Sequence, residues 1–483
     1  MTHATALSCS IIRCLAVATI ALPFSALLWR FCVTRRTGGR RYTAIALAVA
    51  PLFVPDLLVG FTYRLTSARL LHSDVGTEAL YSGLLLVRVL ALQVAARLLL
   101  PRSAVSAESL HSWRLLSPQT AGWGRQWLRM NIMGRYRTTL VAWLAGGLLC
   151  FQEFETAALV QINQLPVVWT VWLFDAFAAG EPLSLSLQHV GTAVIFQLVL
   201  LSPAVVLLRS SGPSAVEERV SVLNSQVPAP PVWSARCGTV LLLLLMTAVA
   251  LVIPLWINSG QIVSGLRMLW EQGVFLSRTV QVLQSLATSV LAAGLALWIC
   301  RDLVGRGVLS VCCLSLGLCG SLVLSLVMLG VFQLPVLRIA YDTYIPMVAT
   351  QTLWLLPRAW LLLALLRVLT DRESLHSARL LLDSQDTEVA ATAQRTLWRL
   401  GRLRWLLAVC VLTHWSFWDV SIVSLLRPVQ FEPIVTRLYN EMHYGRTDTL
   451  IAMTVLSVAM PFVLALAGGL LLLLVPFRRR RRG

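Results

Sequence analysis

Eleven long apolar stretches constrain this chain more than any other feature of its sequence. A bilayer has a hydrocarbon core about 30 Å thick, which takes roughly 20 helical residues, and each stretch reaches about that length. They cover residues 9–30, 43–63, 78–99, 138–160, 186–208, 235–257, 281–300, 306–332, 346–370, 404–427 and 450–476. The mean hydropathy of +0.75 excludes an ordinary soluble enzyme. The sequence therefore predicts an all-α polytopic membrane protein with about 11 transmembrane helices.

The arginines indicate how these spans are oriented. All 40 basic residues are arginine, so functions that need lysine, such as a Walker A loop or a Schiff base, are excluded. The arginines flank the apolar stretches, and most fall on one side if the tail Arg478–Arg482 is cytoplasmic. The net charge of +18 therefore favours a membrane over nucleic acid as the partner. We expect an N-terminus outside, a C-terminus in the cytoplasm, and a first span that anchors the chain and is not a cleaved signal peptide.

One further apolar segment, residues 165–180, imitates a span. Its aromatic side chains are Trp169, Trp172, Phe174 and Phe177. Counting it as a span would invert every later connection and place the arginine-rich tail outside. We therefore expect an extracytoplasmic segment that is interfacial or re-entrant.

The sequence contains an internal repeat. Residues Glu108–Leu116 recur as Glu373–Leu381 with eight of nine positions identical, an offset of 265. The repeat predicts two parallel pseudo-symmetric halves, residues 1–209 with five spans and 235–483 with six, joined by a cytoplasmic linker at 210–234. Two like halves can enclose a path between them, which favours a transport function.

Each half places a long cytoplasmic loop, 100–137 or 371–404, before its penultimate span, and each loop carries the repeated element. Segments Gln152–Leu159, Asp419–Pro428 and Arg437–Arg446 complete the pattern. In this layout the chain resembles the permease subunits of binding-protein-dependent ABC importers, specifically the fused two-half permeases of the ferric-iron and thiamine type.

The resemblance implies which residues meet partner proteins. In the family the loop forms a coupling helix that docks on a separate cytoplasmic ATPase, here expected in two copies. The corresponding coupling residues are Glu108, His111, Ser112, Arg114, Leu116, Glu373, His376, Ser377, Arg379 and Leu381. The glycine of the family signature is replaced by Ser117 and Leu382, so the docking geometry is expected to differ. An extracytoplasmic substrate-binding protein would contact Asp175, Glu432, Arg437, Tyr439, His443 and Tyr444.

The resemblance also implies a bacterial inner (plasma) membrane location and contact with lipid. It places ATP and Mg on the partner subunit, leaves no cofactor on this chain, and indicates ferric iron as the substrate. Thiamine, polyamine and oxyanion substrates remain open.

Two arginines lie deep within apolar stretches. Arg88 and Arg358 are each about nine positions, or roughly 13 Å of helix, further in than Arg97 and Arg367. The outer pair can extend to the interface, whereas an arginine at the inner depth costs several kcal/mol unless it is paired or hydrated.

Carboxylates are available as partners for both inner arginines. We expect Arg88 to pair with Glu153 or Glu155, and Arg358 to pair with Asp419, in positions that line or gate the translocation path. A static interhelical ion pair away from the substrate is the alternative.

Other functional classes are weighed by the motifs that they require. No catalytic motif stands out, so we expect a transport subunit and not an enzyme. The outer segment 430–446 mixes residue types that can ligand iron, yet tyrosine and histidine there are more typical of interfacial anchors, so we predict no metal site. The alternatives are an ion-coupled secondary transporter that uses Glu153, Glu155 and Asp419, or a non-transporting scaffold derived from a permease.

Overall fold

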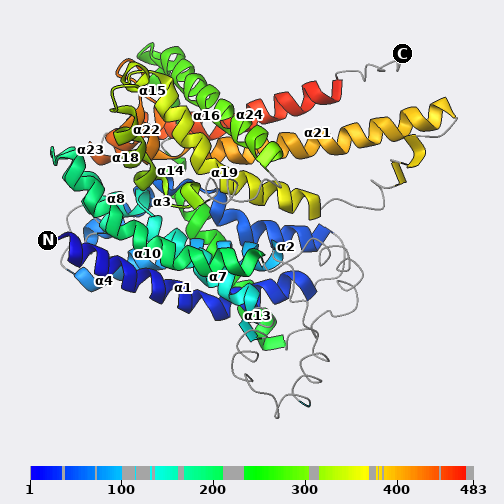
Figure 1. Ribbon diagram of the computed structural model, residues 1–483, viewed down its shortest axis with the longest axis horizontal. Coiled ribbons are helices and arrows are strands. Elements are labelled where there is room, and N and C mark those ends of the chain that lie inside the picture. The colour runs from blue at the N-terminus through cyan, green and yellow to red at the C-terminus, as the bar shows by residue number, and fades with distance from the viewer. Residues whose placement is uncertain are drawn as a thin grey trace. The chain divides into compact units, whose positions relative to one another are not determined.

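The computed structural model is built of helices throughout its described part (Figure 1). The described residues are 2–34, 39–70, 73–99, 115, 131–132, 136–160, 168–209, 233–260, 262–303, 315–368, 377–378, 380–382, 386–444 and 448–474.

Six of the described helices are long and apolar enough to cross a membrane. They are His3–Thr34, Asp74–Leu98, Leu183–Pro203, Arg236–Ser259, Phe275–Arg301 and Leu450–Gly469. Two bent pairs, Tyr42–Phe53 with Asp56–Arg69 and Trp405–Phe417 with Val420–Leu426, raise the number to eight if each pair is one span. The chain is therefore a multi-pass membrane protein, while the count of eleven stays a prediction.

The helices form two compact units, Met1–Ser259 and Gly260–Gly483. The sequence groups the stretch 235–257 with the second half, but its helices belong to the first unit, where α13 (Trp233–Thr247) packs against α1 and α2. The boundaries of the predicted permease halves therefore stay a prediction.

The first unit has three mutually packed helices at its centre, α1 (His3–Thr34), α4 (Asp74–Leu99) and α7 (Arg137–Gln152). The remaining elements are α2 (Gly39–Val49), η1 (Ala50–Phe53), α3 (Asp56–Arg69), α8 (Glu155–Val160), α9 (Trp169–Ala178), α10 (Leu183–Arg209), α13, η4 (Ala248–Val252) and α14 (Ile253–Ser259). Helix α3 packs on α8, while α10 packs on α7 and α9.

A glycine and a glutamine set the close packing of this centre. A methyl group on Gly146 of α7 would lie 2.8 Å from Val89 Cγ1 and 3.0 Å from Gln93 Nε2 of α4, so the approach of the two helices requires glycine. Gln93 is fully buried; it donates to the Ala18 carbonyl oxygen (2.9 Å) and accepts from Ser25 Oγ (2.9 Å). Small and polar residues thus join helices whose outer faces are apolar.

The second unit also has a centre of three mutually packed helices, α16 (Phe275–Leu303), α19 (Tyr344–Val368) and α21 (Thr387–Phe417). The other elements are α15 (Ile262–Glu271), α18 (Ser321–Phe332), η5 (Arg338–Ala340), α22 (Val420–Leu426), α23 (Ile434–Tyr444) and α24 (Asp448–Leu474). Helix α18 packs on α22, and α24 packs on α21 and α23. The N-terminal part of α21 extends beyond the other helices of this unit (Figure 1).

Several stretches that the sequence reads as continuous spans are interrupted. Stretch 43–63 bends by 76° between η1 and α3, where Pro51 and Pro55 lack the N–H groups that would continue a helix. Stretch 404–427 bends by 62° between α21 and α22, and stretch 138–160 is divided into α7 and α8. Each break places a polar residue at the start of a new helix inside an otherwise apolar segment.

Within segment 165–180, residues Trp169–Ala178 form the short helix α9. Helix α9 has 10 residues and packs against α1 and α10. Trp169 is buried and donates from Nε1 to the Phe151 carbonyl oxygen at 2.7 Å. Its interfacial or re-entrant position relative to a membrane stays a prediction.

Candidate functional site

Arg88 forms an ion pair in the first unit, but with a partner that the sequence reasoning missed. Its guanidinium in α4 contacts the carboxylate of Asp56, the first residue of α3, and both side chains are largely buried. The expected partners were Glu153 and Glu155, which begin the α7–α8 break and α8 itself. The break before α3 explains the difference, because it places Asp56 beside α4.

Glu153 caps the short helix α8. Its side chain is 5% exposed and accepts from the backbone N–H of Thr156 (2.6 Å) and of Ala157 (3.2 Å). It also accepts from Tyr81 Oη of α4 at 2.7 Å, while its main-chain oxygen accepts from Thr170 Oγ1 of α9 at 2.6 Å. Glu153 therefore joins α4, α7, α8 and α9.

A second ion pair lies in the same region. Arg13 of α1 contacts both carboxylate oxygens of Glu78, at 2.5 Å from Nε and 2.7 Å from Nη2. The Arg13 guanidinium also lies over the Tyr81 ring, 5.1 Å from its centroid. We call the set Arg13, Asp56, Glu78, Tyr81, Arg88 and Glu153 the first-unit charge cluster.

A sequence signal existed for the members that sequence reasoning missed. Arg13 and Asp56 each lie within an apolar stretch, and Glu78 begins another. Charged residues at such depth are functional candidates by default. Their pairing could not be assigned, because Arg13 and Glu78 are 65 positions apart in the chain.

In the second unit, Asp419 occupies the break between α21 and α22. Its side chain is 5% exposed and accepts from the Ile422 backbone N–H at 2.8 Å, so it caps α22. The side chain of Ser321, the first residue of α18, lies beside this carboxylate.

Arg358 is close enough to Asp419 for their charges to interact. Its guanidinium nevertheless donates to the Trp354 carbonyl oxygen at 2.8 Å and lies 3.8 Å from the Trp354 ring centroid. The guanidinium of Arg358 therefore lies close to the Asp419 carboxylate, while it donates its hydrogen bond to the Trp354 carbonyl oxygen.

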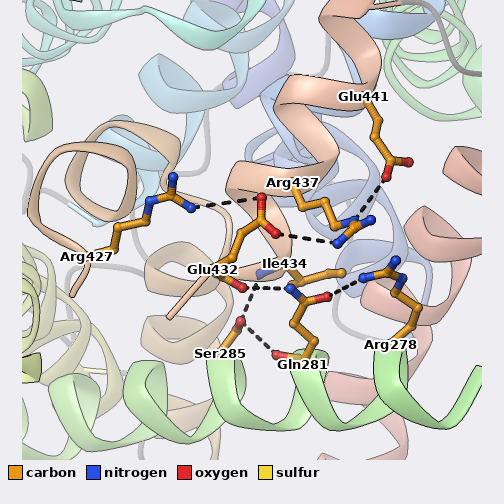
Figure 2. Close-up of polar contacts among 8 residues, drawn as sticks. All are labelled: Arg278, Gln281, Ser285, Arg427, Glu432, Ile434, Arg437 and Glu441. Carbon is orange, nitrogen blue, oxygen red and sulfur yellow. Dashed lines mark hydrogen bonds and ion pairs between the residues drawn. The ribbon is translucent and has the colours of Figure 1, made fainter. Parts of the chain in front are cut away.

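A separate polar cluster joins α23 to α16 (Figure 2). Ser285 Oγ accepts from the Ile434 backbone N–H at 3.0 Å, and Gln281 Nε2 donates to the Glu432 carbonyl oxygen at 2.9 Å. Arg278 Nη1 in turn donates to Gln281 Oε1 at 3.1 Å. Side chains of α16 thus provide hydrogen-bond partners for the backbone at and just before the start of α23.

Ion pairs complete this cluster, which we call the α16–α23 cluster. The Glu432 carboxylate lies 3.4 Å from Arg437 Nη1 and 3.9 Å from Arg427 Nη1, while Arg437 Nε contacts Glu441 at 3.0 Å. The α16–α23 cluster consists of Arg278, Gln281, Ser285, Arg427, Glu432, Ile434, Arg437 and Glu441. It holds three arginines and two glutamates, so its charge is positive.

The residues expected to contact a binding protein are distributed over both units. Glu432 and Arg437 come together in the α16–α23 cluster. Tyr439 is only 9% exposed. His443 and Tyr444 lie in the last turn of α23, and their side chains are outside the described residues. Asp175 is an exposed residue of α9 in the first unit.

Most of the expected ATPase-coupling residues lie outside the described part of the chain. These are Glu108, His111, Ser112, Arg114, Leu116, Glu373, His376 and Arg379. Ser377 and Leu381 are helical and exposed, and Leu381 is 45% exposed.

Among the described residues, no group of three or more His, Cys, Asp or Glu side chains could hold a metal ion. Comparison with known proteins found no matching family model, curated protein or solved structure.

Proposed function

We propose that this chain is the permease subunit of an ATP-driven importer, in which it forms the substrate translocation path and couples to a separate cytoplasmic ATPase. The observation that carries the proposal is a constant offset of 265 between helices of the two units. It relates the bounds of α10 (Leu183–Arg209) to those of α24 (Asp448–Leu474), the starts of α9 and α23, and the ends of α7 and α21. This supports a duplicated transporter architecture.

Packing within each unit supports the same duplication. In the first unit α1, α4 and α7 pack together and α3 packs on α8; in the second, α16, α19 and α21 pack together and α18 packs on α22. Matching packing partners are expected when both halves derive from one ancestral fold, and a recurring break supports this further, because Glu153 and Asp419 each cap the helix that follows it.

The region before α21 supports coupling to another protein. Leu380, Leu381 and Leu382 are 63%, 45% and 37% exposed, and they precede a helix of 31 residues. Consecutive exposed leucines on a polar connection are a favourable docking surface, because burial against a partner removes their apolar area from water. In the proposed orientation these residues face a cytoplasmic ATPase dimer.

The charged residues take two roles in this proposal. Arg88, Glu153, Glu155, Arg358 and Asp419 line or gate the path at the helix breaks. The α16–α23 cluster, with Glu432 and Arg437, faces an extracytoplasmic substrate-binding protein. The bacterial inner membrane is the proposed location, and ferric iron, from the family resemblance, is the proposed substrate.

Affinity purification from the native membrane in mild detergent tests the proposal. We expect stoichiometric recovery of an ATP-binding subunit with ATPase activity. Scrambling both Glu108–Leu116 and Glu373–Leu382 should remove that subunit, since these segments would form its docking site. Scrambling residues 212–230 of the linker is the matched control and should leave recovery unchanged. Recovery of a folded chain alone, without ATPase activity, would refute the importer function.

An ion-coupled secondary transporter is the second candidate, and the first-unit charge cluster favours it. Buried ionisable residues in membrane helices are characteristic of proton and ion pathways. Uptake into vesicles energised by an ion gradient distinguishes the two functions. An uncoupler should abolish uptake by a secondary transporter and leave uptake by an ATP-supplied importer intact.

A further inference from the structure

The charges of the first-unit charge cluster do not balance. Its three carboxylates, Asp56, Glu78 and Glu153, face two guanidiniums, Arg13 and Arg88. Arg13 and Glu153 are among the most buried charged residues of the unit. In a low-dielectric interior an uncompensated charge is unfavourable, and such a group gains a counterion or a proton.

The two guanidiniums are both engaged. Arg13 contacts both oxygens of Glu78, so that pair is complete. Arg88 contacts Asp56 through the carboxylate oxygen Oδ2. The described contacts therefore leave the third carboxylate, Glu153, without a guanidinium of its own.

Glu153 is held by neutral donors. One oxygen accepts from the Thr156 N–H, and the other accepts from Tyr81 Oη and the Ala157 N–H. These donors stabilise a negative charge on Glu153. That charge interacts unfavourably with a negative charge on Asp56.

One carboxylate oxygen of the cluster is free to carry a proton. Both oxygens of Glu78 and both of Glu153 already accept hydrogen bonds. Asp56 Oδ1 is buried and has no hydrogen-bond partner in the described structure. A proton added there displaces no existing hydrogen bond, whereas a proton on Glu78 or Glu153 would.

We propose that Asp56 Oδ1 is a proton-binding site; with the proton bound, Arg88 balances the charge of Glu153 and the cluster is neutral. Tyr81 and the thiols of Cys14 and Cys150 also face the cluster and are uncharged in their ordinary states. The site goes beyond the proposed importer function and is independent of it.

The second unit provides an internal comparison. At the position 265 residues after Asp56 stands Ser321, which lies beside Asp419. Among the described residues, one carboxylate there faces one guanidinium, that of Arg358, so the two charges are equal in number. The first unit therefore differs from the second by one carboxylate in excess over the guanidiniums.

Infrared spectroscopy of the full-length protein in liposomes, recorded between neutral and mildly acidic pH, tests the site directly. A protonated carboxyl group gives a carbonyl stretching band that is separate from carboxylate bands and shifts in D₂O. We expect such a band in the unmodified protein and its loss in Asp56→Asn. We also expect its loss in Glu153→Gln, although Asp56 remains, because Asp56 then keeps its negative charge to balance Arg88. Asp419→Asn is the matched control and should leave the band in place.

Three outcomes would overturn the proposal. They are absence of the band in the unmodified protein, its persistence in Asp56→Asn, and its persistence in folded Glu153→Gln. If the band is absent and sodium instead raises the thermal midpoint in an Asp56-dependent manner, the cluster binds a metal cation and not a proton. Should Asp56→Asn fail to fold, Glu153→Gln carries the test. None of these results depends on recovery of an ATPase, so failure here is distinguishable from failure of the importer function.

Discussion

Single residues in the first unit illustrate how buried charges are accommodated in a membrane protein. Arg13 and Glu78 come from different helices and make two parallel contacts, the geometry in which a guanidinium and a carboxylate compensate each other best. Gly146 shows the complementary requirement, since the distance between α4 and α7 leaves no room for a side chain. Stability at this scale depends on which side chains pair and on how much volume each side chain occupies between packed helices.

Breaking the Arg13–Glu78 pair is predicted to destabilise the protein. Arg13→Gln should lower the free energy of unfolding by about 2 kcal/mol, because it leaves the partly buried Glu78 carboxylate facing a neutral side chain. The double variant Arg13→Gln with Glu78→Gln should recover part of the loss, since no unpaired charge remains. Unfolding measurements in detergent on the double-mutant cycle check this, and strictly additive losses would contradict the pairing.

Gly146→Ala is predicted to destabilise by about 1 kcal/mol, because overpacking against Val89 exceeds the gain in helix propensity. The control is Gly83→Ala in α4, where an added methyl group meets nothing within 4 Å. That variant should be neutral or slightly more stable. Equal thermal midpoints for the two variants would be evidence against the close approach of α4 and α7.

At the scale of elements, the breaks between α7 and α8 and between α21 and α22 share one construction. Each ends a long helix, and a buried carboxylate then accepts backbone N–H groups of the short helix that follows. Without that acceptor, the free N–H groups of α8 and α22 would be unsatisfied in an apolar environment. The carboxylates therefore have a structural role at the breaks whatever else they do.

Asp419→Ala is predicted to lower stability by about 1 to 2 kcal/mol through loss of the cap on α22. Asp419→Asn should retain most of the stability, because an asparagine oxygen accepts the same hydrogen bond from Ile422. Thermal unfolding of both variants in detergent checks the difference. If Asn is as destabilising as Ala, the negative charge near Arg358 matters more than the cap.

At the scale of the whole molecule, the boundary between the two compact units lies after residue 259, whereas the predicted halves are divided at the linker 210–234. The predicted linker at 210–234 runs into the start of α13, yet α13 packs on α1 and α2 in the first unit. Tyr63 Oη donates to the Val249 carbonyl oxygen at 2.9 Å and adds a contact between α3 and η4. The segment after the linker thus returns to the unit that precedes it.

A chain divided between Ser214 and Ala215 is therefore predicted to reassemble. Co-expressed residues 1–214 and 215–483 should purify together, because α13 and α14 of the second fragment complete the first unit. A second fragment shortened to 260–483 should be recovered severalfold less. Equal recovery of the two second fragments would show that α13 and α14 do not hold them together.

Sequence by itself determined the class of this protein. Apolar stretches of membrane length specify a multi-pass helical protein, because backbone polar groups in a bilayer must find hydrogen-bond partners inside the protein and a helix pairs most of them locally. It also marked Arg88 and Arg358 as residues that need a counter-charge or hydration within the membrane, and Glu153, Glu155 and Asp419 as the candidate partner carboxylates.

Only the tertiary structure decided which charges meet. Asp56 became the partner of Arg88, and Glu78 that of Arg13, because α4 packs on α1 and on η1, which precedes α3, and so joins residues that periodicity leaves unrelated. Likewise, the bends at Pro55 and Asp419 depend on which acceptors bind the backbone N–H groups that the break leaves without a partner in the helix. Hydropathy measures the free energy of transferring a side chain from water to an apolar phase, and it carries no information on which residues lie side by side. Ion pairs and helix caps depend on the relative placement of distant segments.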